Sequence, residues 1–298
     1  MYHCSTQYRN WTFTEQQLKE RRAKSNADYI ERHIQERDRS EFLTADEEAV
    51  LLRYYEMQMK DFCNKFRPPM PKMVIATSLQ YFKRFYVRNS VMDYHPRDIY
   101  LICVYSACKI DEFIISIIDF IRNIKNCSNI EQTADVLLSY ELLLIEKLDF
   151  QLIVHNAYRP FEGLIIDLKT HLPPEKVNDA DHLRMLGMNE FLEKTLTSDV
   201  YFFFPPSQVA LTALVFASVK EKVDIDAYIV DHICSSLDRA DLHKVKDTIR
   251  LIASVVNSTT PFNKSEAKAL DKKLEKCYNR ENDPRSAHLN KLDEANGY

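Results

Sequence analysis

Glycine is nearly absent from this chain, with only 3 glycines in 298 residues. Sheet-rich folds and phosphate-binding loops depend on glycine, because tight turns and close backbone approach need positive φ angles or a missing side chain. Gly163, Gly187 and Gly297 also cannot complete the dinucleotide-binding or P-loop patterns. The sequence therefore predicts an all-α fold of long helices and excludes kinases, NTPases and Rossmann enzymes.

Apolar residues recur at helical spacing in five segments before residue 150. Thr44 and Glu47 form a capping-box pattern at the start of the first segment, and Pro71 and Pro96 suit the starts of the second and third. The third is apolar enough to be buried on several sides, so we expect a central helix there. The expected helices cover residues 44–66, 71–88, 96–107, 114–124 and 133–148.

A second set of five apolar segments follows a stretch that contains Asn156, Pro160 and Gly163, which we interpret as an interdomain connector or the entry to the next helix. Pro206 precedes this set's third helix as Pro96 precedes the first set's, which indicates a degenerate internal repeat. The segments are 164–168, 191–204, 209–219, 228–233 and 245–256. Charged helices are expected at 14–41 and 264–280, and a disordered polar tail after them.

Composition limits the partners and the compartment. The net charge of −4 argues against direct binding to nucleic acid. Seven irregularly spaced cysteines, with no C-x-x-C pair, favour reduced thiols. The N-terminus is polar and no apolar run is long enough to span a membrane, so we expect an intracellular soluble protein without membrane contact.

Few side chains are placed to carry chemistry. The nine histidines show no paired ligand spacing, so we expect no metal site and no cofactor, and no acid–base pair of carboxylates emerges. The run at residues 81–86 alternates aromatic and basic side chains, as in single-strand nucleic-acid binders, but its helical spacing favours core plus solvated rim. Lys109 and Glu141 lie at the edges of apolar helices, where an unpaired buried charge is costly. Spacing alone favours an intradomain ion pair over a contact with a partner protein.

Several stretches resemble the cyclin box. They are residues 81–86, 92–96, 107–113, 140–145, 155–156, 158–163, 167–170 and 206–213. By these stretches the chain is identified as a member of the cyclin family, similar to its cyclin H group over residues 1 to about 280. The resemblance implies two tandem five-helix cyclin boxes with flanking N- and C-terminal helices. The expected division is 1–43 for the N-terminal flank, 44–152 and 153–259 for the two boxes, and 260–298 for the C-terminal helix and tail.

The resemblance also implies a function. A cyclin H-like chain would be a nuclear, non-catalytic regulatory subunit of cyclin-dependent kinase 7 in the CDK-activating kinase, together with a RING-finger assembly factor, and would also act within the TFIIH core assembly. Lys109 and Glu141 would face the kinase and hold its mobile αC helix inward. A pocket beside them would receive a side chain of that helix. By resemblance, the pocket residues are Ile110, Ile145, Leu148 and Phe150.

Three alternatives stay open. Another transcriptional cyclin would select a different kinase. A DNA-bound factor of the TFIIB type also has two five-helix repeats, but it would need a basic surface and usually a zinc ribbon, and the sequence shows neither. A helical enzyme with an unrecognised active site would show turnover in an activity screen of the pure protein.

Overall fold

The computed structural model describes residues 2–35, 38–125, 127, 129–173, 177–258 and 263–282. These residues form helices, turns and loops, and no strand occurs among them, which confirms the all-α prediction. None of the helices in the described ranges is both long and apolar enough to cross a membrane. The described residues divide into two compact units. We call residues 15–154 with 263–282 the first unit, and residues 2–14 with 155–258 the second unit.

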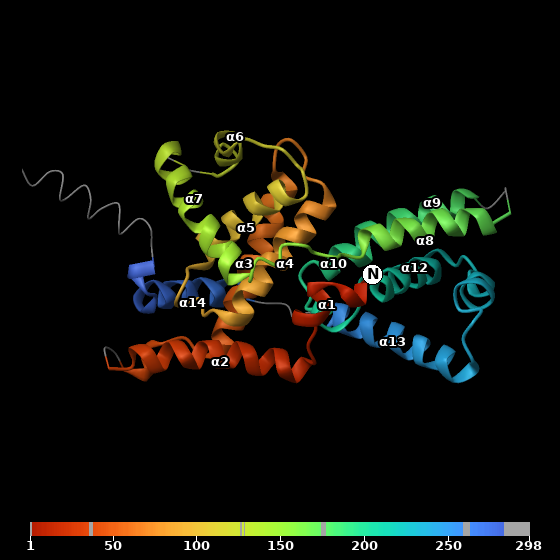
Figure 1. Cartoon of the computed structure of the whole chain (residues 1–298), viewed down its shortest axis with the longest axis horizontal. Helices are drawn as coiled ribbons and strands as arrows, with labels where there is room; N and C mark the ends of the chain where they lie inside the picture. The colour runs from red at the N-terminus through yellow and green to blue at the C-terminus, as the bar shows by residue number, and fades with distance from the viewer. Residues whose placement is uncertain are drawn as a thin grey trace, which may run out of the picture. The chain divides into compact units, whose positions relative to one another are not determined.

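The first unit is built around two buried helices (Figure 1). Every residue of α4 from Val74 to Val87 is buried, and α5 is buried over most of its length. Proline at N1 starts α5, as predicted, and a complete Thr44–Glu47 capping box starts α3. The helices of this unit are α2 (Glu15–His33), α3 (Ala45–Lys65), α4 (Lys72–Arg88), α5 (Pro96–Ile110), α6 (Ile117–Ile121), α7 (Ile130–Lys147) and α14 (Lys264–Cys277).

The expectation of a solvated basic rim on α4 is wrong. Lys83 and Arg84 are both buried, because each charge has buried partners. Lys83 Nζ lies 2.7 Å from Glu56 Oε1 of α3, and Arg84 Nη1 donates to the main-chain oxygen of Gln151 at 3.1 Å. Buried cations cannot neutralise phosphates, so this run gives no support to nucleic-acid binding.

Helices α2 and α14 flank the same unit although they lie at opposite ends of the sequence (Figure 1). The Tyr29 hydroxyl of α2 donates to the main-chain oxygen of Cys277 at 2.7 Å. On α3, the Tyr55 hydroxyl donates to Asp271 Oδ1 of α14, also at 2.7 Å. The charged helix expected at 264–280 is therefore confirmed as α14. The tail expected to be disordered lies outside the described residues from 283 onward.

The second unit differs from its sequence prediction at several places, one of which is α9 (Val177–Leu186), a helix that the apolar pattern did not predict. Helix α8 begins at Tyr158, earlier than expected, because Pro160 lies in the first turn, where its missing N–H removes no helical hydrogen bond. The single helix expected at 191–204 is instead a π-helical turn followed by two short helices. Ser198 and Thr195 hydroxyls bond to nearby main-chain oxygens there, which competes with a continuous helix.

The main helices of the second unit otherwise follow the expected order, and the N-terminal residues pack with them. The Gln7 side chain donates to the main-chain oxygen of His155 and accepts from its N–H. The elements are η1 (Tyr2–Cys4), α1 (Thr6–Asn10), α8 (Tyr158–His171), α9 (Val177–Leu186), η4 (Gly187–Leu192), α10 (Glu193–Thr195), α11 (Val200–Phe203), α12 (Pro206–Glu221), η5 (Tyr228–Ile233) and α13 (Arg239–Asn257).

Candidate functional site

An ion pair joins α5 and α7 at the surface of the first unit. Lys109 Nζ in the last turn of α5 lies 2.6 Å from Glu141 Oε1 of α7, and their side chains are 43% and 24% exposed. The same ammonium lies 4.8 Å from the centroid of the Tyr105 ring, one turn earlier, and makes a favourable cation–π contact with it. The pair that the sequence favoured is therefore formed, and both charges remain within reach of a partner.

Both helices that carry this pair end in a turn that contains a left-handed residue. The N–H of Phe113 donates to the main-chain oxygen of Cys108 after α5, and the N–H of Phe150 donates to that of Ile145 after α7. These bonds close Schellman-type ends, in which glycine usually takes the left-handed position. Here Glu112 and Asp149 take it, at φ 59° and 52°. Left-handed non-glycine residues cost roughly 1–2 kcal/mol each, and Phe150, which follows Asp149, is a further one at φ 58°.

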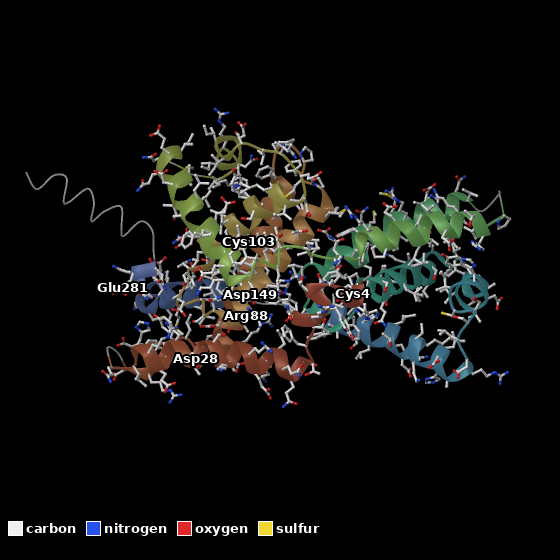
Figure 2. All side chains as sticks on the ribbon, viewed as in Figure 1. Cys4, Asp28, Arg88, Cys103, Asp149 and Glu281 are labelled. Atoms are coloured by element: carbon white, nitrogen blue, oxygen red, sulfur yellow. The ribbon has the colours of Figure 1, made fainter. Side chains whose placement is uncertain are left out.

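A stripe of α4 fixes the chain that follows α7. The Tyr81 hydroxyl donates to the main-chain oxygen of Leu152, and Arg84 donates to that of Gln151. Arg88 pairs with Asp149, and the labels of the two residues lie next to each other in Figure 2. Positions 81, 84 and 88 share one helix face. The buried helix α4 thus holds residues 149–152 in place, and with them Phe150.

The structure places the remaining predicted pocket residues at different depths. Ile110 and Phe150 are exposed, with 69% of Phe150 accessible, and Ile145 is half-buried. Leu148 is fully buried at the C-cap of α7. In this conformation Leu148 can only support the surface from beneath, whereas the other three can be touched by a partner.

Further exposed apolar side chains, which were not singled out from the sequence, lie on α7 and just after the end of α5. Ile114 is 97% exposed and Leu142 is 69% exposed. Leu138, Glu141, Leu142 and Ile145 follow the i, i+3, i+4, i+7 pattern of one helix stripe on α7. The opposite, buried stripe consists of Leu137, Tyr140 and Leu144. The signal was present in the uninterrupted run Leu142 to Ile145, because four consecutive apolar residues cannot all face the core of one helix.

The second unit contains a cavity of about 650 Å³ bounded by α8, α12, η5 and α13. Its described lining is mainly apolar and contains no histidine. Its hydroxyls come from Ser207 and Thr248 and its thiol from Cys234, and its two charged residues, Asp241 and Lys244, pair with each other. Burial raises the pKa of the Cys234 thiol, which keeps it protonated and weakly nucleophilic. This cavity therefore offers no assembled acid–base or nucleophilic chemistry.

Histidine spacing led us to expect no metal site, yet the second unit brings potential ligands together. Asp167 and His171 lie one turn apart on α8, and His232 of η5 approaches them. Histidine spacing does not reveal this group, because its helical pair is Asp-x-x-x-His and its third member is distant in sequence.

Comparisons with known families match both units. The model described as the cyclin N-terminal domain matches residues 12–153, and the model described as the cyclin C-terminal domain matches residues 156–257. Cyclin-H of Xenopus laevis is 40% identical over 287 residues, which cover 94% of this chain and 88% of that protein. Cyclin-H1-1 of Arabidopsis thaliana is 34% identical over 241 residues, covering 79% and 68%.

Solved structures resemble the chain over most of its length. A chain in the structure of the CAK complex from Chaetomium thermophilum bound to ATP-γ-S has a TM-score of 0.78 and 28% identity, covering 99% of this chain and 94% of that one. A chain of the yeast TFIIK (Kin28/Ccl1/Tfb3) complex has a TM-score of 0.66 and 26% identity, covering 86% and 100%. Both neighbours come from assemblies, and Lys109 and Glu141 lie within the residues that the cyclin N-terminal domain model matches.

Proposed function

The chain belongs to the cyclin family, and from this premise we propose that it is the regulatory subunit that binds and activates cyclin-dependent kinase 7. The family assignment rests on two domain models that together match residues 12–153 and 156–257, and on 40% identity to a Cyclin-H across 94% of the chain. In this role it supports the activation of cell-cycle kinases and, within TFIIH, the phosphorylation of the C-terminal domain of RNA polymerase II. The protein itself is not an enzyme, and it works in the nucleus.

The observation that carries this proposal is the exposed ion pair between α5 and α7 with exposed apolar side chains around it. A buried anchor side chain surrounded by polar contacts is the usual arrangement of a binding hot spot. Lys109 and Glu141 bond the loop before the kinase αC helix, and Ile110, Ile145 and Phe150 receive an apolar side chain from that helix, with Leu148 beneath them. The polar pair sets the orientation, and the apolar contacts supply affinity.

Activation follows from differential binding. A kinase requires the ion pair between its β3 lysine and its αC glutamate, which forms when αC moves inward. A surface that binds the inward conformer better than the outward one shifts the population by that difference in affinity, and about 5.5 kcal/mol takes a ratio of 1:99 to 99:1. No bond is made or broken by this chain.

Assembly into a larger complex is part of the same proposal. One neighbour is a subunit of a CAK complex, and the other is from a three-protein TFIIK complex. We infer that this chain also binds a RING-finger assembly factor and, through the complex, the TFIIH core. The buried state of Lys83 and Arg84 and the cyclin domain matches argue against the TFIIB-like alternative.

The test is co-purification of the chain with cyclin-dependent kinase 7, with and without the assembly factor, and a kinase assay on a C-terminal-domain peptide. The double variant Lys109→Ala/Glu141→Ala should weaken binding about tenfold or more, because a hot spot contributes about 2 kcal/mol, and should lower kinase activity. The matched control is Lys169→Ala/Asp181→Ala, which removes an exposed pair of equal length, 2.6 Å, from the second unit.

Three outcomes of this experiment decide whether the proposed kinase and the proposed binding face are correct. Loss of binding in the first variant and none in the control supports the proposed face. If both double variants bind the kinase equally well, the Lys109–Glu141 pair is not part of the interface. Failure of the unaltered chain to bind this kinase, while it binds another cyclin-dependent kinase, would identify a different transcriptional cyclin.

A further inference from the structure

Three side chains with metal-binding atoms meet on the surface of the second unit. Asp167 and His171 share one face of α8, and His232 projects from η5. One ligand atom from each lies within 4.8 Å of the other two. All three side chains are partly or largely exposed, so an ion can reach them from solvent.

The spacing fits one small cation. His232 Nε2 lies 3.1 Å from Asp167 Oδ2, and the rings of His171 and His232 have centroids 3.8 Å apart. Two ligand atoms on a tetrahedral zinc ion, with bonds of about 2.0–2.1 Å, are separated by about 3.3 Å. The three ligand atoms lie within 4.8 Å of one another, so the exposed side chains have to rotate to bring all of them to that separation.

Neighbouring groups already orient these ligands. The Tyr228 hydroxyl donates to Asp167 Oδ2 at 2.7 Å. His171 Nδ1 lies 2.9 Å from the main-chain oxygen of Asp167. Because a carbonyl can only accept, Nδ1 carries the proton of the neutral ring and Nε2 keeps the lone pair that a metal needs. Hydrogen bonds of this kind fix ligand tautomers and orientations at protein metal sites.

We propose that Asp167, His171 and His232 form a binding site for a divalent transition metal of the zinc class. Two imidazole nitrogens and one carboxylate oxygen suit zinc, whereas calcium and magnesium prefer ligand sets built from oxygen. Three protein ligands leave at least one coordination position for water. His232 and the orienting Tyr228 both come from a π-helical turn, an element that often marks functional sites.

The metal would connect α8 to η5 within the second unit. An ion that binds the folded state and not the unfolded chain raises stability by RT ln(1 + c/Kd), where c is the free ion concentration, so Tm rises with the logarithm of that concentration once it exceeds Kd. This effect is independent of the proposed kinase-binding role, because its ligands belong to the second unit and the kinase face belongs to the first.

The test is equilibrium dialysis of the full chain, free of any histidine tag and first stripped with a chelator, against zinc ions, with bound metal measured by elemental analysis. Cobalt(II) absorption reports the ligand geometry independently. We expect one zinc per chain, a zinc-dependent rise in Tm, and the loss of both in His171→Ala and His232→Ala. Tyr228→Phe, which removes an orienting bond, should raise Kd by about tenfold or more while leaving all three ligands in place.

The matched control is His243→Ala. His243 and Asp247 form an exposed pair on α13, with Nδ1 and Oδ2 2.8 Å apart, and this pair resembles the proposed site without a third ligand. The variant should bind zinc as the unaltered chain does. The proposal is overturned if the unaltered chain binds no zinc, or if His171→Ala and His232→Ala bind it equally well, which would place the ion on other groups such as the cysteines. His232→Gln replaces His232→Ala if circular dichroism shows that the alanine variant is unfolded.

Discussion

Two lysine–glutamate pairs in the first unit have almost the same length and opposite surroundings. Lys83 and Glu56 are 2.7 Å apart with side chains only 1% and 7% exposed, whereas Lys109 and Glu141 are 2.6 Å apart and remain accessible. A buried pair loses its hydration and must be satisfied inside the protein, whereas an exposed pair gains little for the fold. The distance between the charges therefore says little about their role, and the burial of the pair says much.

Corresponding helices of the two cyclin domains also share their geometry and differ in a charged residue. Helices α5 and α12 both begin with proline at N1, and Ala107 and Ala217 occupy the same position along them. Both end in a Schellman-type turn with a left-handed residue, Glu112 in α5 and Lys222 in α12. At the position of Lys109, however, α12 has Val219, which is exposed. The scaffold is repeated, but of these two helices only α5 has a lysine at this position, the one that we propose faces the kinase.

The largest effect is expected when the buried pair is broken. Glu56→Ala removes the carboxylate that lies 2.7 Å from the buried Lys83 ammonium, so the free energy of unfolding should fall by up to about 3–5 kcal/mol. Chemical denaturation followed by circular dichroism measures this loss. The double variant Lys83→Met/Glu56→Met removes both charges and should recover much of it. A loss below about 1 kcal/mol in Glu56→Ala would mean that water or other groups satisfy Lys83 without Glu56, and the comparison between the pairs would fail.

A buried carboxyl without a cation sharpens the contrast. Glu48 accepts hydrogen bonds from Ser90 and Asn26, and burial raises its pKa to about 7. Its folded-state pKa lies above the unfolded value, so the folded protein retains a proton that the unfolded chain loses. This carboxyl therefore stabilises the fold fully below about pH 4.5, and the contribution is lost as pH rises to about 7.

Glu48→Gln should remove that dependence. Relative to the unaltered chain, the variant should gain about 2–3 kcal/mol of stability between pH 4.5 and 7, since one pKa unit corresponds to 1.36 kcal/mol. Denaturation midpoints measured at several pH values give this difference. A constant cost from altered hydrogen bonding does not change with pH, so a flat difference across the range would show that Glu48 ionises normally.

Much of the fold could be predicted from sequence, because helix starts and apolar periodicity are local signals. The pairing of residues far apart in the sequence could not be predicted in this way. The Thr44–Glu47 capping box and Pro96 fix helix starts within a few residues, and the structure confirms both. The burial of Lys83 was missed because helical periodicity cannot show that Glu56 lies opposite it on another helix. The site was anticipated only where a charge interrupted an apolar helix, as at Lys109. The roles of Ile110, Ile145, Leu148 and Phe150 as kinase contacts stay predictions.

The smallest effect is expected for the exposed pair, and it has to be measured as a coupling. Lys109→Ala and Glu141→Ala should each change the free energy of unfolding by less than about 1 kcal/mol, and the double-mutant cycle should give a coupling of about 0.2–1 kcal/mol. Salt should reduce that coupling further, because exposed charges are screened. The same variants should nevertheless lower kinase binding, so a change in binding without a change in stability is the signature of a partner-facing pair. A coupling of several kcal/mol would instead make Lys109–Glu141 a structural pair like Lys83–Glu56, and the difference between the two pairs would disappear.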